Sequence, residues 1–238
     1  MASSDVRRSS PAWVVAATVA LVLAAVFFGH VLGRSTGQAA PSFRPTPQNP
    51  DPSRAIPGVQ IVQYRDRPHV APDQRVAYDH SPPFGGPHDG VWADCTGVVY
   101  PRPVRSENMV HSLEHGAVWI AYAPGRVDDA GLRRLAARVD GKPYTMMSPY
   151  PGLDRPISLQ SWGHQLKVDR ADDPRIDQFI AALRLNSHGV YPEVGATCQA
   201  HPGTFDISAP PPFDPTPPGP DAVPMNGRGA AGGGPMGR

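Results

Sequence analysis

Two stretches of the chain show the spacing of an amphipathic helix. The first begins after Asp128, a residue suited to cap a helix N-terminus. The second begins after Asp173, with Pro174 in the first position, where a missing amide hydrogen costs nothing. Apolar side chains recur three and four residues apart in both stretches and fall on one face. They are Leu132, Leu135, Ala136 and Val139 in the first, and Ile176, Phe179, Ile180 and Leu183 in the second.

Short apolar or alternating runs predict the strands of a sheet. The runs lie at residues 59–64, 76–78, 98–100, 118–122, 144–147 and 157–168. Gly163 lies inside the last run, where a glycine predicts a bulge or a close approach of another backbone. Many short strands with few helices are typical of an α+β fold, here a mainly antiparallel sheet with the two amphipathic helices on one face.

A much longer apolar segment precedes the domain and predicts one transmembrane helix. Residues 12–33 contain almost no polar side chain, and at 1.5 Å per residue they span about 30 Å, the thickness of the hydrocarbon core. Arg7 and Arg8 precede the segment and favour a cytoplasmic location for residues 1–11. We therefore expect a single-pass plasma-membrane protein with its domain outside the cell. The alternative is a secreted chain cleaved near Ala39, although the apolar run exceeds the roughly 7–15 residues of a signal peptide core.

Composition divides the rest of the chain into three parts. The sequence has 31 prolines and 24 glycines, which concentrate at the two ends of the part beyond the anchor. We expect a proline-rich linker at 34–56, an α+β domain at 57–207 and a disordered proline- and glycine-rich tail at 208–238.

Charge and motifs exclude two classes of partner. Lys and Arg number 22 against 21 Asp and Glu, and no basic block stands out, so nucleic-acid binding is not expected. The glycine-rich motifs that cradle nucleotide phosphates are missing as well. Cys95 and Cys198 are the only cysteines, and outside the cytoplasm they are expected to pair. Closing so long a loop could stabilise the fold by about 4 kcal/mol.

The candidate chemistry lies just before the strand at 118–122. His111, Glu114 and His115 fall within five residues, and His69 and His88 precede them in loop-like sequence. Helical and extended backbone would both bring His111 and His115 to one face, whereas Glu114 would join them only in a helix. Imidazoles with a nearby carboxylate are what a zinc or copper site requires. The sequence therefore predicts a metal site of His69, His88, His111 and His115, with Glu114 as ligand or neighbour.

Two other interpretations of these residues stay open. The histidines could form a structural hydrogen-bond network, in a non-catalytic domain whose loop at 82–90 contacts an envelope protein. The order His-x-x-Glu-His also matches inverted zinc proteases, but their motif needs a long helix, and Gly116 with a β-like run follows at once. A metal-dependent hydrolase with Glu114 as the general base is thus a distant third. Convergence of three imidazole nitrogens within about 3–4 Å of one point would favour a metal.

Several short motifs together resemble a known bacterial family, the domain of unknown function 3105. They cover about residues 57–195, and His-Ser-Leu-Glu-His-Gly at 111–116 is the most specific. The others are His69-Val70, Pro82-Pro83, Gly86-Pro87-His88, the rest of 110–124, Pro149 to Leu153 and Trp162-Gly163. Phe84-Gly85 and His164 depart from the family pattern. The resemblance implies an anchored or secreted protein and brings no established activity with it.

Overall fold

The computed structural model of the protein describes residues 42–229. The predicted cytoplasmic segment, the transmembrane helix at 12–33 and the cleavage site near Ala39 lie outside these residues. Among the helices within 42–229, none combines the length and the apolar character needed to cross a bilayer.

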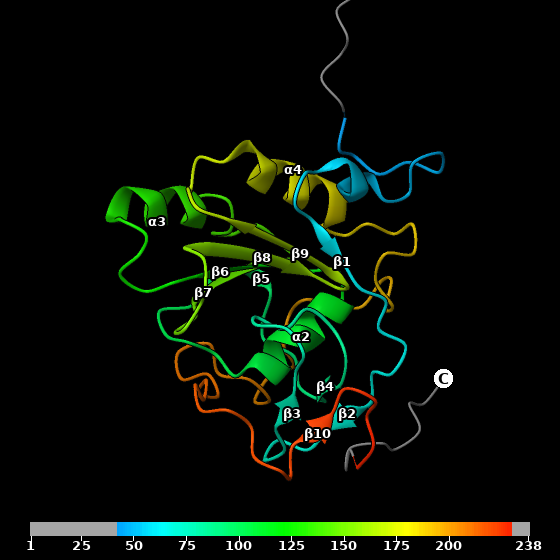
Figure 1. Cartoon of the computed structure of the whole chain (residues 1–238), viewed down its shortest axis with the longest axis vertical. Coiled ribbons are helices and arrows are strands. Elements are labelled where there is room, and N and C mark those ends of the chain that lie inside the picture. The colour runs from blue at the N-terminus through cyan, green and yellow to red at the C-terminus, as the bar shows by residue number, and fades with distance from the viewer. Residues whose placement is uncertain (1–41, 230–238) are drawn as a thin grey trace, which may run out of the picture. The chain divides into compact units, whose positions relative to one another are not determined.

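A six-stranded sheet forms the centre of the domain (Figure 1). Its strands lie in the order β1-β9-β8-β6-β7-β5. The first four strands in this order are antiparallel to one another, whereas β7 is parallel to both β6 and β5. Their bounds are Gln60–Ile61, His164–Val168, Ile157–Ser161, Val118–Tyr122, Thr145–Pro149 and Thr96–Val99 in that order. The prediction of an α+β fold with a mainly antiparallel sheet is confirmed.

Two helices, α3 (Asp129–Ala136) and α4 (Pro174–Leu183), cover one face of this sheet (Figure 1). Each begins with the predicted aspartate cap. Asp128 accepts a hydrogen bond from the amide of Gly131 at 2.7 Å, and Asp173 accepts one from the amide of Arg175 at 2.9 Å. Their apolar faces share a buried core with alternate residues of the strands, so both predicted helices are confirmed.

A third helix, α2 (Ser106–Glu114), lies on the opposite face of the sheet (Figure 1). The sequence predicts only a loop or a single turn here. All nine residues of α2 are buried, polar ones included, because the helix lies between the sheet and the loops beyond it. A helix enclosed in this way lacks the polar stripe that marks a surface helix, so periodicity could not reveal it.

The long strand predicted at 157–168 is two strands. β8 and β9 form an antiparallel hairpin in which Ser161 pairs with His164. Gly163 occupies the turn with φ of 69°, a conformation that glycine adopts most readily. A β-carbon there would lie 2.6 Å from the carbonyl oxygen of Val62, so the close approach was predicted correctly but the turn was not.

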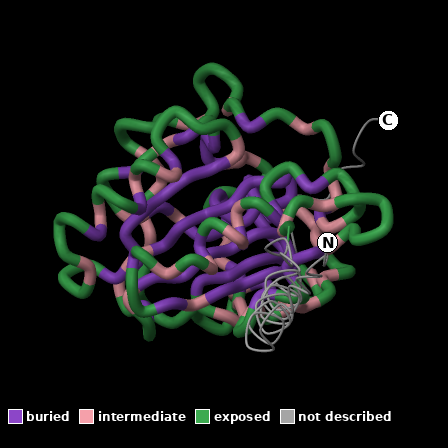
Figure 2. Tube along the Cα trace, turned by 90° about the horizontal axis from the view of Figure 1, so that it is seen from above, coloured by how far each residue is buried: buried purple, intermediate pink, exposed green. Residues whose placement is uncertain are grey.

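Two small parallel sheets lie beyond α2 (Figure 1). One joins β2 (His69–Val70) to β4 (His88–Asp89), and the other joins β3 (Val76–Ala77) to β10 (Val223–Pro224). The loop at 82–89 leads into β4 and is buried throughout. Figure 2 shows how burial is distributed over the domain: the strands in the middle are buried, and many of the connections around them are exposed.

Residues 208–229, where the sequence predicts disorder, follow a defined path along the domain. The amide of Arg105 donates to the carbonyl of Pro211 at 2.8 Å, and Arg75 pairs with Asp214 at 3.0 Å. β10 then pairs with β3. These contacts depend on backbone groups and an arginine elsewhere in the chain, which is why the proline-rich composition of the segment does not reveal them. The remainder of the predicted tail, 230–238, lies outside the described residues.

The end of the predicted linker also contacts the domain. Pro52–Ala55 forms a short 3-10 helix (η1), and a carboxylate oxygen of Asp51 lies 3.3 Å from Nε2 of His164. The predicted disulfide between Cys95 and Cys198 is present and bridges 103 residues. It joins the start of β5 to the loop that follows α4.

Candidate metal centre

Two histidines of the candidate site come from the small sheet of β2 and β4. His69 and His88 are partners in the parallel register, so their side chains leave the sheet side by side. Their ring centroids lie 5.1 Å apart. The pairing requires the buried loop before β4, because that loop brings His88 back against the segment that carries His69.

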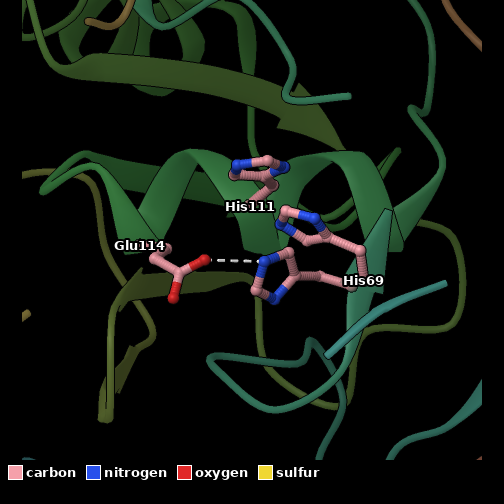
Figure 3. A group of neighbouring side chains, drawn as sticks. His69, His111 and Glu114 are labelled. Atoms are coloured by element: carbon pink, nitrogen blue, oxygen red, sulfur yellow. Dashed lines mark ion pairs between the residues drawn. The ribbon is translucent and has the colours of Figure 1, made fainter. Parts of the chain in front are cut away.

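The helix α2 supplies the other members of the site. His111 and Glu114 are three residues apart and therefore lie on one face of the helix. The His111 ring lies 4.9 Å from the ring of His69 and 4.8 Å from that of His88. Figure 3 shows His69, His111 and Glu114 gathered beside α2, with a dashed line for the contact between His88 and Glu114. The helical alternative for this segment is correct, and it makes Glu114 a full member of the group.

Backbone carbonyls orient the imidazoles. Nδ1 of His88 lies 2.8 Å from the carbonyl oxygen of Gly86, and Nδ1 of His111 lies 2.6 Å from that of Asp89. A carbonyl can only accept, so Nδ1 carries the proton in each ring. The Nε2 atom of the neutral ring then presents its lone pair. This is the arrangement that orients metal-binding histidines in proteins.

Three atoms of the group are buried: Nε2 of His69 has no hydrogen-bond partner, and Nε2 of His88 and Oε2 of Glu114 contact only each other. Nε2 of His88 lies 2.7 Å from Oε2 of Glu114, and both side chains are 0% exposed. Two lone pairs at that distance repel each other unless a cation, either a proton or a metal ion, lies between them. A buried polar atom without a partner, such as Nε2 of His69, is costly, which supports a site shaped for a ligand.

The candidate ligand atoms of His69, His88, His111 and Glu114 all lie within 4.8 Å of one another. One point therefore lies within about 3 Å of all four. Bound zinc has distances of about 2.0–2.2 Å to nitrogen and carboxylate oxygen, so small side-chain movements would complete the coordination. The geometric condition stated from the sequence, three imidazole nitrogens within about 3–4 Å of one point, is met.

Arg67 holds the other oxygen of Glu114. Its guanidinium donates a hydrogen bond to Oε1 and forms an ion pair with the carboxylate, while its own side chain stays 38% exposed. Oε2 is thereby left facing the histidines. Sequence reasoning missed Arg67, although its position two residues before His69 in extended backbone puts both side chains on one side.

Burial and mutual repulsion lower the pKa values of His69 and His111 and so favour their neutral forms. Burial first, and then the neighbouring His88, His115 and His69, lower the pKa of His111 to about 2. Burial also lowers the pKa of His69. Burial acts to raise the pKa of Glu114, but His88 and Arg67 together outweigh it and leave that pKa lowered. Neutral imidazoles and an ionised carboxylate are the protonation states that bind a metal.

His115 belongs to a second group, formed with His111 and Glu193. Its Nδ1 donates to the carbonyl of Thr197 at 2.7 Å, and its Nε2 lies 3.2 Å from a carboxylate oxygen of Glu193. The sequence predicts His115 as a ligand beside His69 and His88, whereas the structure brings it together with His111 and Glu193. From the sequence, Glu193 appears only as a loop residue, because no spacing signal links it to His115 some eighty positions earlier.

Trp92 packs against both groups. Its ring lies 5.4 Å from that of His111 and 4.7 Å from that of His115, and its indole nitrogen is buried without a hydrogen-bond partner. His201 packs on the indole at 4.8 Å. His80 lies apart from the cluster and contacts Gln60.

Fold and site together define an α+β domain with a buried cluster of histidines and glutamates held between a helix and a small parallel sheet. The chain belongs to the family described as protein of unknown function (DUF3105), whose model matches residues 69–200. The match begins at His69 and includes the other members of both groups. No curated protein and no solved structure matches the chain.

Proposed function

We propose that this domain binds one divalent transition-metal ion through Nε2 of His69, His88 and His111 and through one oxygen of Glu114. The observation that carries the proposal is the convergence of ligand atoms of His69, His88, His111 and Glu114 within 4.8 Å of one another, with Nε2 of His69 buried and without a hydrogen-bond partner. A purely structural network would account for the contact between His88 and Glu114 but would leave Nε2 of His69 without a partner.

The donor set favours zinc or divalent copper. Both groups consist of imidazole nitrogens and carboxylate oxygens, which suit Zn²⁺ and Cu²⁺, whereas thiolates and thioethers suit monovalent copper. The contact with Arg67 leaves Glu114 one oxygen for the metal. The proposed coordination is thus three nitrogens and one oxygen, the number that zinc prefers.

The proposed setting is the outer side of the plasma membrane, with the segment at 12–33 as the anchor. The disulfide between Cys95 and Cys198 supports this setting, because such bonds persist in oxidising compartments. The ligands are largely enclosed, with His88 and Glu114 fully buried, which supports a binding role over catalysis on a large substrate.

Metal content of the purified full chain tests the proposal directly. The chain is produced without a polyhistidine tag, stripped with chelator, dialysed against Zn²⁺ or Cu²⁺ and measured by elemental analysis. We expect one equivalent of metal. Glu114→Gln, which keeps the shape of the side chain, should weaken binding by more than the about 10–100-fold loss typical of residues that only support a ligand.

The matched control is His188→Ala, which removes an exposed imidazole outside both groups. It should keep the full equivalent, whereas His111→Ala should lose it. A wild-type chain without stoichiometric metal, combined with strong destabilisation by His111→Ala, would instead identify the histidines as a structural network.

A further inference from the structure

The two ligand groups share one residue, His111. Its Nδ1 is occupied by the carbonyl of Asp89 at 2.6 Å, so only Nε2 remains for a metal. A neutral imidazole nitrogen has one lone pair and binds one ion at a time. The inner group (His69, His88, His111 and Glu114) and the outer group (His111, His115 and Glu193) are therefore alternative positions for a single ion.

Each group has one partly exposed member, Glu193 in the outer group and His69 in the inner group. The side chain of Glu193 is 27% exposed, whereas Nε2 of His69 is buried and the side chains of His88 and Glu114 are 0% exposed. The outer group also has one donor fewer, so it should hold a metal less tightly and leave coordination positions for water.

The loop that carries Glu193 is built onto the end of α2. The amide of Glu193 donates to the carbonyl of Glu114 at 3.1 Å, and the carbonyl of Thr197 accepts from His115 at 2.7 Å. The Cys95–Cys198 disulfide fixes the loop one residue beyond Thr197. Glu193 and His115 are thus held in place next to the inner group.

We infer that the outer group is the entry position for the metal of the inner group. An ion from solvent binds first to Glu193 and His115 together with Nε2 of His111. It then exchanges Glu193 and His115 for His69, His88 and Glu114 while His111 stays bound, and it leaves by the reverse route. This inference rests on the proposed function and adds a route to it. Each step exchanges ligands only, with no change of oxidation state.

Rates of Cu²⁺ loading into the stripped full chain test the route. Quenching of tryptophan emission in a stopped-flow instrument reports arrival, since Trp92 packs against His111 and His115. In Glu193→Gln we expect loading and release to slow together by about tenfold, which is a rise of about 1.4 kcal/mol in both barriers. Stoichiometry stays at one equivalent and the equilibrium affinity stays unchanged.

The control variant is Asp169→Asn, which removes one negative charge from an exposed pair with Arg155. It separates loss of a ligand from loss of general attraction for cations, and it should load at the wild-type rate. Equal rates in Glu193→Gln and Asp169→Asn would overturn the route.

Two further results would also overturn it. Binding of two equivalents by the wild-type chain would make the groups independent sites, and a large loss of affinity in Glu193→Gln would make Glu193 an ordinary ligand. If the wild-type chain binds no metal, the proposed function is wrong as well as the entry route. A chain that binds one equivalent at rates insensitive to Glu193 removes only the entry route.

Discussion

At the scale of single residues, the backbone decides which nitrogen of each imidazole is available. Carbonyls of Gly86, Asp89 and Thr197 each accept a hydrogen bond from an Nδ1 atom, which leaves an Nε2 atom facing the cluster in each case. The sequence shows that histidines are near one another along the chain. It cannot show which nitrogen a carbonyl twenty or eighty residues away will occupy.

Gly116 is the residue at which α2 gives way to the strand β6, and it makes a testable case. Its φ is 93°, and a β-carbon there would lie 2.6 Å from the ring of Tyr191. We expect Gly116→Ala to lower the free energy of unfolding by about 1–3 kcal/mol because of the backbone conformation. Displacement of the Tyr191 ring should lower it further. Denaturant unfolding followed by circular dichroism measures the change.

Gly141→Ala is the matched control for this substitution. Gly141 also has a positive φ, of 66°, but nothing lies within 4 Å of an added β-carbon. The loss of unfolding free energy in Gly141→Ala should come from the backbone conformation alone and should be smaller than that in Gly116→Ala. Equal losses in the two variants would mean that the contact with Tyr191 contributes nothing.

At the scale of elements, the helices differ in how readily the sequence pattern reveals them. α3 and α4 each have one buried and one solvated face, so their periodicity and aspartate caps identify them. α2 is buried on all sides and begins after Arg105, whose side chain makes no capping hydrogen bond. Its polar residues are satisfied by other parts of the chain, as when Ser112 donates to the carbonyl of Ala93 at 2.6 Å. The element that carries the site was therefore the one hardest to predict.

An ion pair joins the helices α3 and α4. Arg138, just after α3, pairs with Asp177 of α4 through two contacts at 2.6 and 2.8 Å. The hydrogen bond from Arg138 lowers the pKa of Asp177, against the opposing effect of burial. A lowered pKa means that the folded state gains stability above the ordinary carboxyl pKa and loses it as the pH falls through the folded value.

We therefore expect Asp177→Asn to be less stable than the wild type at pH 7 but equal to it in strong acid. The side chain of Asp177 is 62% exposed, so solvent screening limits the difference to about 0.2–1 kcal/mol. Urea unfolding at pH 7 and below pH 3 gives both values. A difference that stays constant across this range would show that the charge of Asp177 plays no part.

At the scale of the whole molecule, long-range connections assemble the site. The disulfide closes a loop of 103 residues and fixes the segment that carries Glu193 and Thr197. The segment at 208–229 returns to the small sheets, where a β-carbon on Gly86, in the loop before His88, would lie 2.5 Å from the side chain of Met225. Neither connection follows from local periodicity.

Replacing Cys95 and Cys198 together by alanine should lower the free energy of unfolding by about 2–5 kcal/mol, because the unfolded chain regains the freedom of the open loop. Denaturant titration of the variant and the wild type measures the loss. The control repeats both titrations with a reductant that opens the bond in the unfolded chain. The two proteins should then be nearly equally stable, and a gap that persists would point to packing of the sulfur atoms instead.

The sequence by itself predicted the α+β class, the two amphipathic helices, the pairing of the cysteines and one set of site histidines that did not separate His115 from His69, His88 and His111. These features depend on periodicity, on caps and on residue types, all of which are local. Only the tertiary structure decided that Glu114 and Arg67 complete one group, that His115 turns to Glu193, and that a buried helix carries both. Those choices depend on which backbone groups distant segments bring to each side chain, and no local pattern contains that information.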